Sequence, residues 1–468
     1  MAELWWKPAH ELAAMIRRRE LKPSELMDAT IRRLEQVNPK VNAFCALRAE
    51  QAMAEARAMD EKIARREELG PLAGLPLGVK DLEDAAGLAT TFGSKPFKNN
   101  LPAADSVQVA RLRAAGAIVL GKTNAPEFGY TDFTKNLLFG VTRNPWNLER
   151  TPGGSSGGSS AAIAGGIVPL ATGSDGGGSI RIPAHFVGCY GLKVSKGRIP
   201  DGPSLGMQQW NDTSVVGALT RTVRDAAIHL DIAAGYHPSD PDSIPAPGIS
   251  YAANLERIPK KLRIAFHPDF GRIVQHDVAR EVEKAVGAFK DMGHEITVLD
   301  DTPVDLSRAW QRVGGTQALA TLSDWIEKHR ADFGRGYLTG VEAASKITWR
   351  HYGAAYRERA QFNRWCERVF ERFDLLLTPT LPIEAFPAKG PHPSEINGIP
   401  VDVMGTVVFT HPFNMSGHPA ASVRAGFTDA GLPCGLQIVA ERYREDLVLQ
   451  ASYAYEQARP WNAKWPEI

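Results

Sequence analysis

The chain has 468 residues, of which 43% are hydrophobic and 23% are charged, as is typical of globular proteins. Its 54 basic and 53 acidic residues leave a formal net charge of +1, so the basic surface that nucleic-acid binding requires is not expected. The four cysteines are scattered, without a pair at zinc-ligand spacing, which argues against a zinc site or a disulfide framework.

The sequence also argues against a membrane span and a secretory signal. The first thirty residues contain three consecutive arginines, Arg17 to Arg19, where a signal peptide needs an apolar stretch. We therefore expect a cytoplasmic protein. Trp5 and Trp6 precede a helical pattern and could contact a membrane surface, but packing against the body of the protein is the favoured interpretation.

The N-terminal third is dominated by helical patterns. Apolar residues recur every three or four positions over residues 9–39 and 51–67, and Pro23 to Glu25 is typical of a helix start. A short apolar strand is then predicted over 75–81, a helix over 105–116 and a strand over 117–124.

Helices and strands continue to alternate in the second half of the chain. A long helical stretch is predicted from Leu306 to about Phe373, and residues 238–248 are predicted as an exposed loop. The alternation favours an α/β protein with helices on both faces of a sheet. The remaining predicted elements are helices over 221–235, 276–293 and 445–458, and strands over 261–269, 294–300, 374–380, 419–426 and 434–440.

One motif suggests nucleotide binding without the context that this function requires. Residues 116–123 read GAIVLGKT and match the phosphate-loop pattern GxxxxGK[ST]. A phosphate loop connects a strand to a helix whose N-terminal amides bind the phosphate. Here the four middle residues have a β pattern and Asn124-Ala125-Pro126 follows, so a nucleotide site is not favoured.

A glycine- and serine-rich run, TPGGSSGGSS, occupies residues 151–160 between ordered, apolar flanks. This context predicts a tightly folded loop rather than a flexible linker. A second glycine cluster, Gly176 to Gly178, immediately precedes Ser179. The amides of these four residues could turn toward one point and bind an oxyanion, with Ser179 as the nucleophile.

A nucleophilic serine needs a base, and the sequence offers two candidates. His185 is the only histidine near Ser179, and we interpret it as structural. Lys80 lies in the short apolar segment LPLGVKD, where burial would lower its pKa enough for it to act as a base. Taken alone, this segment favours a surface lysine at a strand end.

These segments resemble the signature of the amidase signature hydrolases. The resemblance rests on GLPLGVKD (74–81), GGSSGG (153–158) and GSDGGGSIRIPAHFVGCYGLK (173–193). Further matches are GKTNAPEF, FGVTRNPW, DLLLTPT, FNMSGHPAASV and GLPCGLQIVA, so the resemblance covers nearly the whole chain.

The resemblance implies a Ser-Ser-Lys catalytic triad. Ser179 would attack the substrate carbonyl, and Ser155, preceded by a cis peptide bond, would carry protons between Ser179 and the base Lys80. Ser156 would support this network. The backbone of Gly129 would line the substrate site.

Other residues are assigned supporting roles by the same resemblance. Asp175 and Arg181 would brace the nucleophile loop, while Tyr130 and Phe133 would form an apolar wall of the pocket. Two positions depart from the family pattern: Gly176 stands where threonine is frequent, and Arg424 where proline is frequent. The first departure could loosen the oxyanion loop or enlarge the site, which affects the expected range of substrates.

The implied fold is α/β, with three α/β/α layers around a large mixed, twisted sheet. One amidase domain would span residues 1–468, with N-terminal helices (1–70), the catalytic core (71–200), a variable substrate entrance (about 200–400) and C-terminal core strands and a helix (401–468). The resemblance implies no metal or nucleotide cofactor. Members of the family are often homodimers.

The expected activity is hydrolysis of carboxylic amides, with esters or carbamates as further candidates. The segment around Tyr130, together with Trp210, favours a small, apolar or aryl substrate, as in aryl acylamidases, urethane-cleaving enzymes and nylon-oligomer hydrolases. One alternative is the glutaminase subunit of a tRNA-dependent amidotransferase. Another is a non-catalytic binding protein, which the presence of all three triad residues disfavours.

Overall fold

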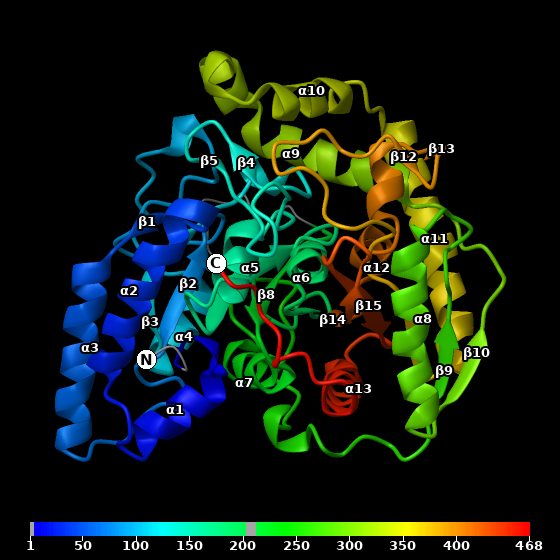
Figure 1. Cartoon of the computed structure of the whole chain (residues 1–468). Coiled ribbons are helices and arrows are strands. Elements are labelled where there is room, and N and C mark those ends of the chain that lie inside the picture. The colour runs from blue at the N-terminus through cyan, green and yellow to red at the C-terminus, as the bar shows by residue number, and fades with distance from the viewer. Residues whose placement is uncertain (1–3, 203–211) are drawn as a thin grey trace.

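An 11-stranded mixed sheet runs through the computed structural model, which describes residues 4–202 and 212–468 (Figure 1). The strand order is β1-β3-β2-β6-β8-β7-β14-β15-β11-β9-β10. The strands are β1 (Phe44–Leu47), β2 (Pro76–Lys80), β3 (Ile118–Thr123), β6 (Leu170–Asp175), β7 (Tyr190–Lys193), β8 (Val215–Thr220), β9 (Arg263–Phe266), β10 (Glu295–Val298), β11 (Leu375–Pro379), β14 (Ala420–Phe427) and β15 (Pro433–Val439).

The sheet is parallel in two places and antiparallel elsewhere. Strand β2 pairs in parallel with β3 and β6, and β9 pairs in parallel with β10 and β11. All residues of β2 and β3 are buried, as expected for strands covered on both faces. Two hairpins lie outside the main sheet: β4 (Lys135–Asn136) with β5 (Gly140–Val141), and β12 (Glu395–Ile396) with β13 (Ile399–Pro400).

Helices cover both faces of the sheet and complete the predicted α/β/α layers. In β11, Leu375 and Leu377 pack in the hydrophobic cluster that contains residues of α8 and α13, whereas Leu376 packs with α9 and α11. This alternation follows from the two-residue period of a strand. The helices are α1 (Ala9–Arg17), α2 (Pro23–Val41), α3 (Ala49–Ala64), α4 (Val107–Ala114), α5 (Gly157–Ala164), α6 (Arg181–Val187), α7 (Val223–Ala233), α8 (His276–Asp291), α9 (Ser307–His329), α10 (Arg335–Ala344), α11 (Trp349–Arg372), α12 (His411–Ser416) and α13 (Glu445–Ala458).

The predicted helical stretch from Leu306 to Phe373 is confirmed and consists of three helices, α9, α10 and α11, because the chain leaves helical geometry at Gly334 and again before Thr348, whose hydroxyl caps α11. The prediction of helices alone over residues 1–70 was wrong, since β1 pairs with β3 at the edge of the sheet.

The phosphate-loop match at residues 116–123 lies in a strand. Residues 118–123 form β3, so Gly121 and Lys122 are strand residues and no loop-to-helix turn is present there. The Lys122 ammonium is fully buried and donates to the carbonyl of Glu83 and, at 2.9 Å, to the hydroxyl of Thr90. These contacts give Lys122 a structural role.

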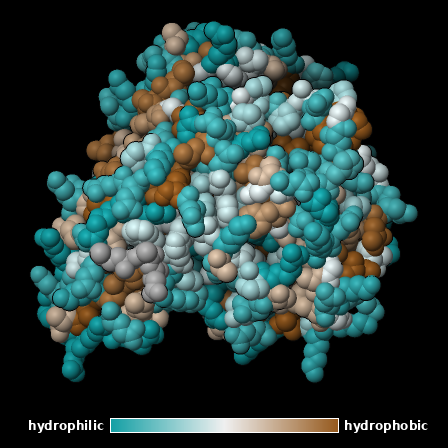
Figure 2. Space-filling model, viewed as in Figure 1, coloured by the Kyte–Doolittle hydropathy of each residue, from teal (hydrophilic) through white to brown (hydrophobic). Residues whose placement is uncertain are grey.

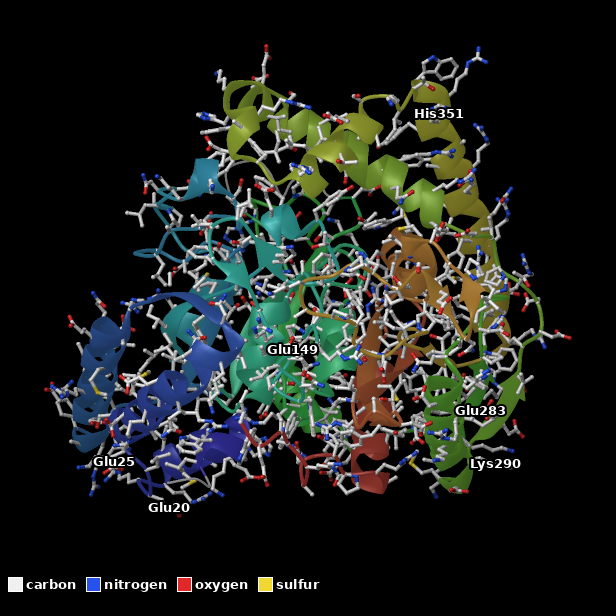
Figure 3. The ribbon with its side chains drawn as sticks, turned by 45° about the horizontal axis from the view of Figure 1, so that its top comes forward. Glu20, Glu25, Glu149, Glu283, Lys290 and His351 are labelled. Carbon is white, nitrogen blue, oxygen red and sulfur yellow. The ribbon has the colours of Figure 1, made fainter. Side chains whose placement is uncertain are left out.

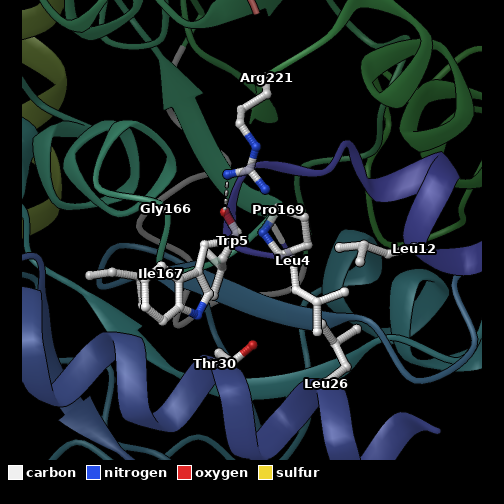
Figure 4. A pocket seen from close by; sticks show the side chains of 10 residues that line it. Leu4, Trp5, Leu12, Leu26, Thr30, Gly166, Ile167, Pro169 and Arg221 are labelled. Carbon is white, nitrogen blue, oxygen red and sulfur yellow. Dashed lines mark hydrogen bonds between the residues drawn. The ribbon is translucent and has the colours of Figure 1, made fainter. Parts of the chain in front are cut away.

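The N-terminal tryptophans pack on the protein, as predicted. The indole of Trp5 donates to the carbonyl of Ala29 at 3.2 Å, and the ring of Trp6 stacks on Trp465 with centroids 6.0 Å apart. Trp5 also borders a cavity of about 10 Å³, which has room for a single water molecule but not for a substrate (Figure 4).

The visible surface is mostly hydrophilic, with small scattered apolar areas (Figure 2). Charged side chains such as Glu20, Glu283 and Lys290 are exposed and lie at the periphery of the molecule (Figure 3). Among the helices of the described residues, none has the length and apolar character needed to cross a bilayer.

Candidate active site

Lys80 is the last residue of β2, and its side chain is buried among hydroxyl groups. Its Nζ atom lies 2.7 Å from the Oγ atom of Ser155, 2.8 Å from that of Ser156 and 2.9 Å from that of Ser174. Its backbone N–H donates to the hydroxyl of Thr172 at 3.0 Å, which links β2 to β6. The structure therefore brings Lys80, Ser155 and Ser156 together, as the sequence predicted.

The environment of Lys80 suits a base. Burial lowers its pKa to about 7, and the carboxylates of Asp175 and Glu83 act in the opposite direction. A neutral amine has a lone pair, so it can accept the proton of one neighbouring hydroxyl while donating to the others. The alternative of a surface lysine is excluded, because the residue is 1% exposed.

The serine-rich run forms an ordered loop followed by the buried helix α5. The peptide bond between Gly154 and Ser155 is cis. Gly153 has a φ of +89°, which a residue with a side chain rarely adopts. At Gly158 a Cβ atom would lie 2.3 Å from the backbone nitrogen of Asn124, so only glycine allows this close approach. The run is a tightly packed structure and not a linker.

Ser179 lies in the loop between β6 and α6 and is half-buried. Its carbonyl accepts the backbone N–H of Ser156 at 3.2 Å, which joins the loop of Ser179, the candidate nucleophile, to the loop that carries Ser155. The two serine-containing segments are thus held against each other.

The prediction that four successive amides face the substrate requires a correction. The N–H of Gly178 donates to the carboxylate of Asp175 at 2.7 Å, so it is not available to an oxyanion. Within the described residues, the amides of Gly176, Gly177 and Ser179 have no protein acceptor. Of the four predicted amides, that of Gly178 is therefore removed from the candidate oxyanion site.

Asp175 and Arg181 form a fully buried ion pair, with 2.9 Å between carboxylate and guanidinium. Burial by itself would raise the pKa of Asp175, but the charge and hydrogen bonds of Arg181 hold that pKa well below its usual range. The guanidinium also donates to the side chains of Gln437 and Asn414, at 2.6 and 2.7 Å. These contacts attach the Ser179 loop to C-terminal segments of the chain.

Gly129 lies against the serine loop. A Cβ atom at Gly129 would be 3.1 Å from the Oγ atom of Ser155, and one at Gly154 would be 2.7 Å from the backbone nitrogen of Phe133. The Phe133 ring packs edge-on against Phe386, with centroids 5.9 Å apart. The segment 129–133 therefore runs alongside Gly154 and Ser155.

Tyr130 and His185 differ in their relation to the site. Tyr130 is 48% exposed, and its ring packs edge-on against Tyr337 of α10. His185 is fully buried, contacts the carbonyl of Ile383 and accepts the N–H of Gly435, and burial lowers its pKa to about 4. Its structural role is confirmed. Trp210 lies outside the described residues.

Several residues of the site were not found from the sequence. Thr172 and Ser174 contact Lys80, while Thr410, Asn414 and Gln437 contact the nucleophile loop or Arg181. Asn414 and Gln437 lie in the motifs FNMSGHPAASV and GLQIVA, which could have identified them. Trp310, whose indole donates to the carbonyl of Gly176, lies in no motif. Within the described residues, no cluster of three metal-ligating side chains occurs.

The fold and these residues define a hydrolase that acts on amide bonds. The sequence profile of the Amidase family matches residues 25–449, and the chain belongs to that family.

The chain is 38% identical to an acylamidase of Rhodococcus erythropolis, over 99% of this chain and 98% of the relative. It is 37% identical to a glutamyl-tRNA(Gln) amidotransferase subunit of Moorella thermoacetica, over 100% and 99% of the two chains. Among solved structures, a bacterial aryl acylamidase superposes with a TM-score of 0.92 at 32% identity, covering 98% of this chain and 97% of that one. For the same type of amidotransferase subunit from Thermotoga maritima, the TM-score is 0.78 at 26% identity, covering 95% of each chain.

Proposed function

We propose that the protein hydrolyses carboxylic amides of small, apolar or aryl substrates through an acyl-enzyme on Ser179. Ser155 would be the proton relay and Lys80 the base. The observation that carries this proposal is the buried Lys80 amine, which lies 2.7 Å from the Ser155 hydroxyl and has a pKa lowered to about 7. A lysine with such a pKa is neutral in an appreciable fraction of molecules at neutral pH.

In the acylation half-reaction, the Ser155 hydroxyl transfers its proton to Lys80 and accepts the proton of Ser179. The Oγ atom of Ser179 adds to the carbonyl carbon, and the carbonyl oxygen becomes an oxyanion. The amides of Gly176, Gly177 and Ser179, which have no acceptor among the described residues, support binding of that oxyanion.

Collapse of the tetrahedral intermediate breaks the carbon–nitrogen bond. Ser155 donates its proton to the departing nitrogen and regains one from Lys80, so an amine leaves rather than an unstable amide anion. In deacylation, a water molecule passes its proton through Ser155 to Lys80 and adds to the ester carbon. Lys80 then returns the proton through Ser155 to Ser179, and the acid is released. Lys80 ends the cycle neutral.

The substrate class is supported by similarity and by the neighbouring aromatic side chains. The TM-score of 0.92 to an aryl acylamidase favours aryl or apolar acyl amides, and Phe133 lies beside the serine loop. Esters and carbamates undergo the same addition and stay within the proposal. Residues 1–468 would act as one amidase domain, since strands from both ends of the chain share one sheet. A homodimer stays a prediction.

A fluorophosphonate probe tests the nucleophile without knowledge of the substrate. We expect one adduct per chain, mapped by peptide mass spectrometry to Ser179 and lost in Ser179→Ala. Screening of anilides, aliphatic amides and carbamates then identifies the substrate class. An adduct at another serine, or no adduct in folded protein, would refute the assignment of Ser179.

A second candidate is the glutaminase subunit of a tRNA-dependent amidotransferase, which the 37% identity to a protein of that type favours. The lower TM-score to the solved amidotransferase structure, 0.78 against 0.92, supports the acylamidase instead. Release of ammonia from glutamine only with added partner proteins, and no turnover of anilides alone, would favour the amidotransferase.

A further inference from the structure

Trp310 contacts the loop that contains the candidate nucleophile. It belongs to α9, which lies over the upper part of the sheet in Figure 1, far in sequence from the catalytic core. Its Nε1–H donates to the carbonyl of Gly176 at 2.7 Å, and the same carbonyl accepts the hydroxyl of Thr213 at 3.1 Å. Gly176 stands where threonine is frequent in the family, but these two hydrogen bonds still hold this part of the loop in place.

The orientation of a carbonyl fixes the orientation of the next amide. In a trans peptide unit the C=O of one residue and the N–H of the next lie in one plane and point in opposite directions. When Trp310 binds the carbonyl of Gly176 from one side, the N–H of Gly177 must point to the other side. That N–H is one of the three loop amides for which the described part of the chain offers no acceptor.

Every neighbouring peptide unit of the loop is held in the same way. The carbonyl of Asp175 accepts the side-chain amide of Asn414 at 2.7 Å, which orients the N–H of Gly176. The carbonyl of Gly178 accepts the N–H of Ile182 at 2.7 Å, which orients the N–H of Ser179. Each of these three amides thus shares its peptide plane with a carbonyl that is held by a hydrogen bond. For Gly177 that carbonyl belongs to Gly176, and the shorter of its two hydrogen bonds comes from Trp310.

The packing of the indole supports the same role. At Gly177 a Cβ atom would lie 2.5 Å from Cζ2 and 2.8 Å from Cε2 of Trp310, so the ring rests directly on the glycine backbone. The ring of His411 also lies near the indole, with centroids 6.0 Å apart. Because the indole is in direct contact with Gly177, it cannot shift toward the loop without moving the Gly176–Gly177 peptide.

We propose that Trp310 is a positioning residue for the oxyanion site: its indole N–H fixes the peptide between Gly176 and Gly177 so that the Gly177 amide faces the reacting carbonyl. This inference rests on the proposed function. It places a determinant of turnover on α9, within the region expected to form the substrate entrance. Changes in that region then alter kcat and not only substrate binding.

The test compares Trp310→Phe with wild type on a substrate found in the amide screen. The variant keeps an aromatic ring but lacks the N–H donor. We expect kcat to fall about tenfold to a hundredfold, while KM stays within about a factor of two. This loss of kcat should not exceed the loss that follows removal of a whole oxyanion donor. Affinity for a trifluoromethyl ketone, which forms an oxyanion adduct with serine, should fall by the same factor as kcat/KM.

Two further proteins separate positioning from general damage. Trp325→Phe is the matched control, because Trp325 lies on the same helix but packs on Phe97 and His329. Replacement of Trp310 by benzothienylalanine exchanges the N–H for sulfur at nearly constant shape, which keeps the test valid even where Trp310→Phe fails to fold. The pH profile of kcat/KM should stay unchanged in Trp325→Phe and in the benzothienylalanine variant, because neither substitution changes a contact of Lys80.

The outcomes distinguish this inference from the proposed function. A wild-type protein that labels at Ser179, with kcat unchanged in Trp310→Phe or in the benzothienyl variant, would refute the inference alone. Equal losses in Trp310→Phe and Trp325→Phe would refute it too, because they would indicate a general effect of α9. A folded wild type that neither labels nor hydrolyses amides would refute both.

Discussion

The Nζ atom of Lys80 lies 2.7 Å from the Oγ atom of Ser155, inside the protein and in contact with two further hydroxyls. Removal of the amine from water, rather than any nearby cation, lowers its pKa to about 7. The most direct predictions concern this pair.

The pH dependence of kcat/KM should report the titration of Lys80. Below its pKa the lysine is charged and cannot accept a proton; above it the amine is neutral. With a neutral anilide as substrate, kcat/KM should therefore fall about tenfold per pH unit below about pH 7 and level off above it. A profile that stays flat from pH 5.5 to 8.5 would contradict this role.

Lys80→Met should abolish most of the activity while Lys193→Met should not. Burial lowers the pKa of both lysines to about 7, but within the described residues Lys193 donates to the carbonyls of Val194 and His418 and to no hydroxyl. We expect a loss of about a thousandfold or more in kcat for Lys80→Met, measured with circular dichroism as a check of folding. Lys193→Met should keep the fall of kcat/KM at acid pH. If that fall disappears in Lys193→Met, the group that titrates is Lys193 and not Lys80.

Ser155 and Ser156 contact the same amine but should differ in their effect on leaving groups. Ser155→Ala removes the relay, so amide cleavage should fall about a thousandfold, whereas a matched ester should lose far less because an alkoxide leaves more easily than an amide anion. Ser156→Ala should slow both substrates by a similar, smaller factor of about ten. Equal losses on amide and ester in Ser155→Ala would argue against proton delivery to the leaving nitrogen.

Gly177→Ala should reduce turnover through contact with Trp310. The added methyl group would lie 2.5 Å from the indole, so the ring and the peptide must move apart. We expect kcat to fall by about tenfold or more, as for a misaligned oxyanion donor. Gly287→Ala in α8 is the control, because nothing lies within 4 Å of its added carbon and alanine favours the helix. If Gly177→Ala retains full kcat, the packing against Trp310 has no catalytic consequence.

Arg424, which stands where the family often has proline, should contribute stability and not activity. Its buried guanidinium donates to the carbonyls of Gly188, Trp461 and Lys464 and lies 4.7 Å from the ring of Trp465. Arg424→Leu should cost about 3–5 kcal/mol of unfolding free energy, measured by urea denaturation, with kcat nearly unchanged.

Arg424→Lys should not restore this stability, because an ammonium lacks the planar fork that reaches three carbonyls. A fully stable Arg424→Lys protein would mean that charge alone, rather than hydrogen-bond geometry, holds the C-terminal segment.

Elements with a strong local pattern were predicted well from the sequence. The helix over 445–458 was predicted with the bounds observed for α13, because its apolar period is uninterrupted. The breaks between α9, α10 and α11 carry no proline, so helical periodicity continues across them. Strand β1 has four residues and pairs only at the edge of the sheet, too short a segment to show alternation.

In the site, residues that lie in short motifs were predicted, whereas contacts between distant segments were not. Lys80, Ser155 and Ser156 lie in short motifs and were brought together as expected. Capture of the Gly178 amide by Asp175 depends on the three-dimensional path of the loop, which the order of residues does not reveal. The contact of Trp310 with Gly176 joins positions 134 residues apart and has no sequence signal.

Strands β14 and β15 lie between β7 and β11, so the middle of the sheet is filled by segments near the C-terminus. The partners of Arg181, including Asn414 and Gln437, come from the same late part of the chain. During synthesis, Ser179 therefore leaves the ribosome more than two hundred residues before Asn414 and Gln437. Ribosome-bound chains that end before residue 400 should not react with a fluorophosphonate, so hydrolytic activity arises only when translation is nearly complete.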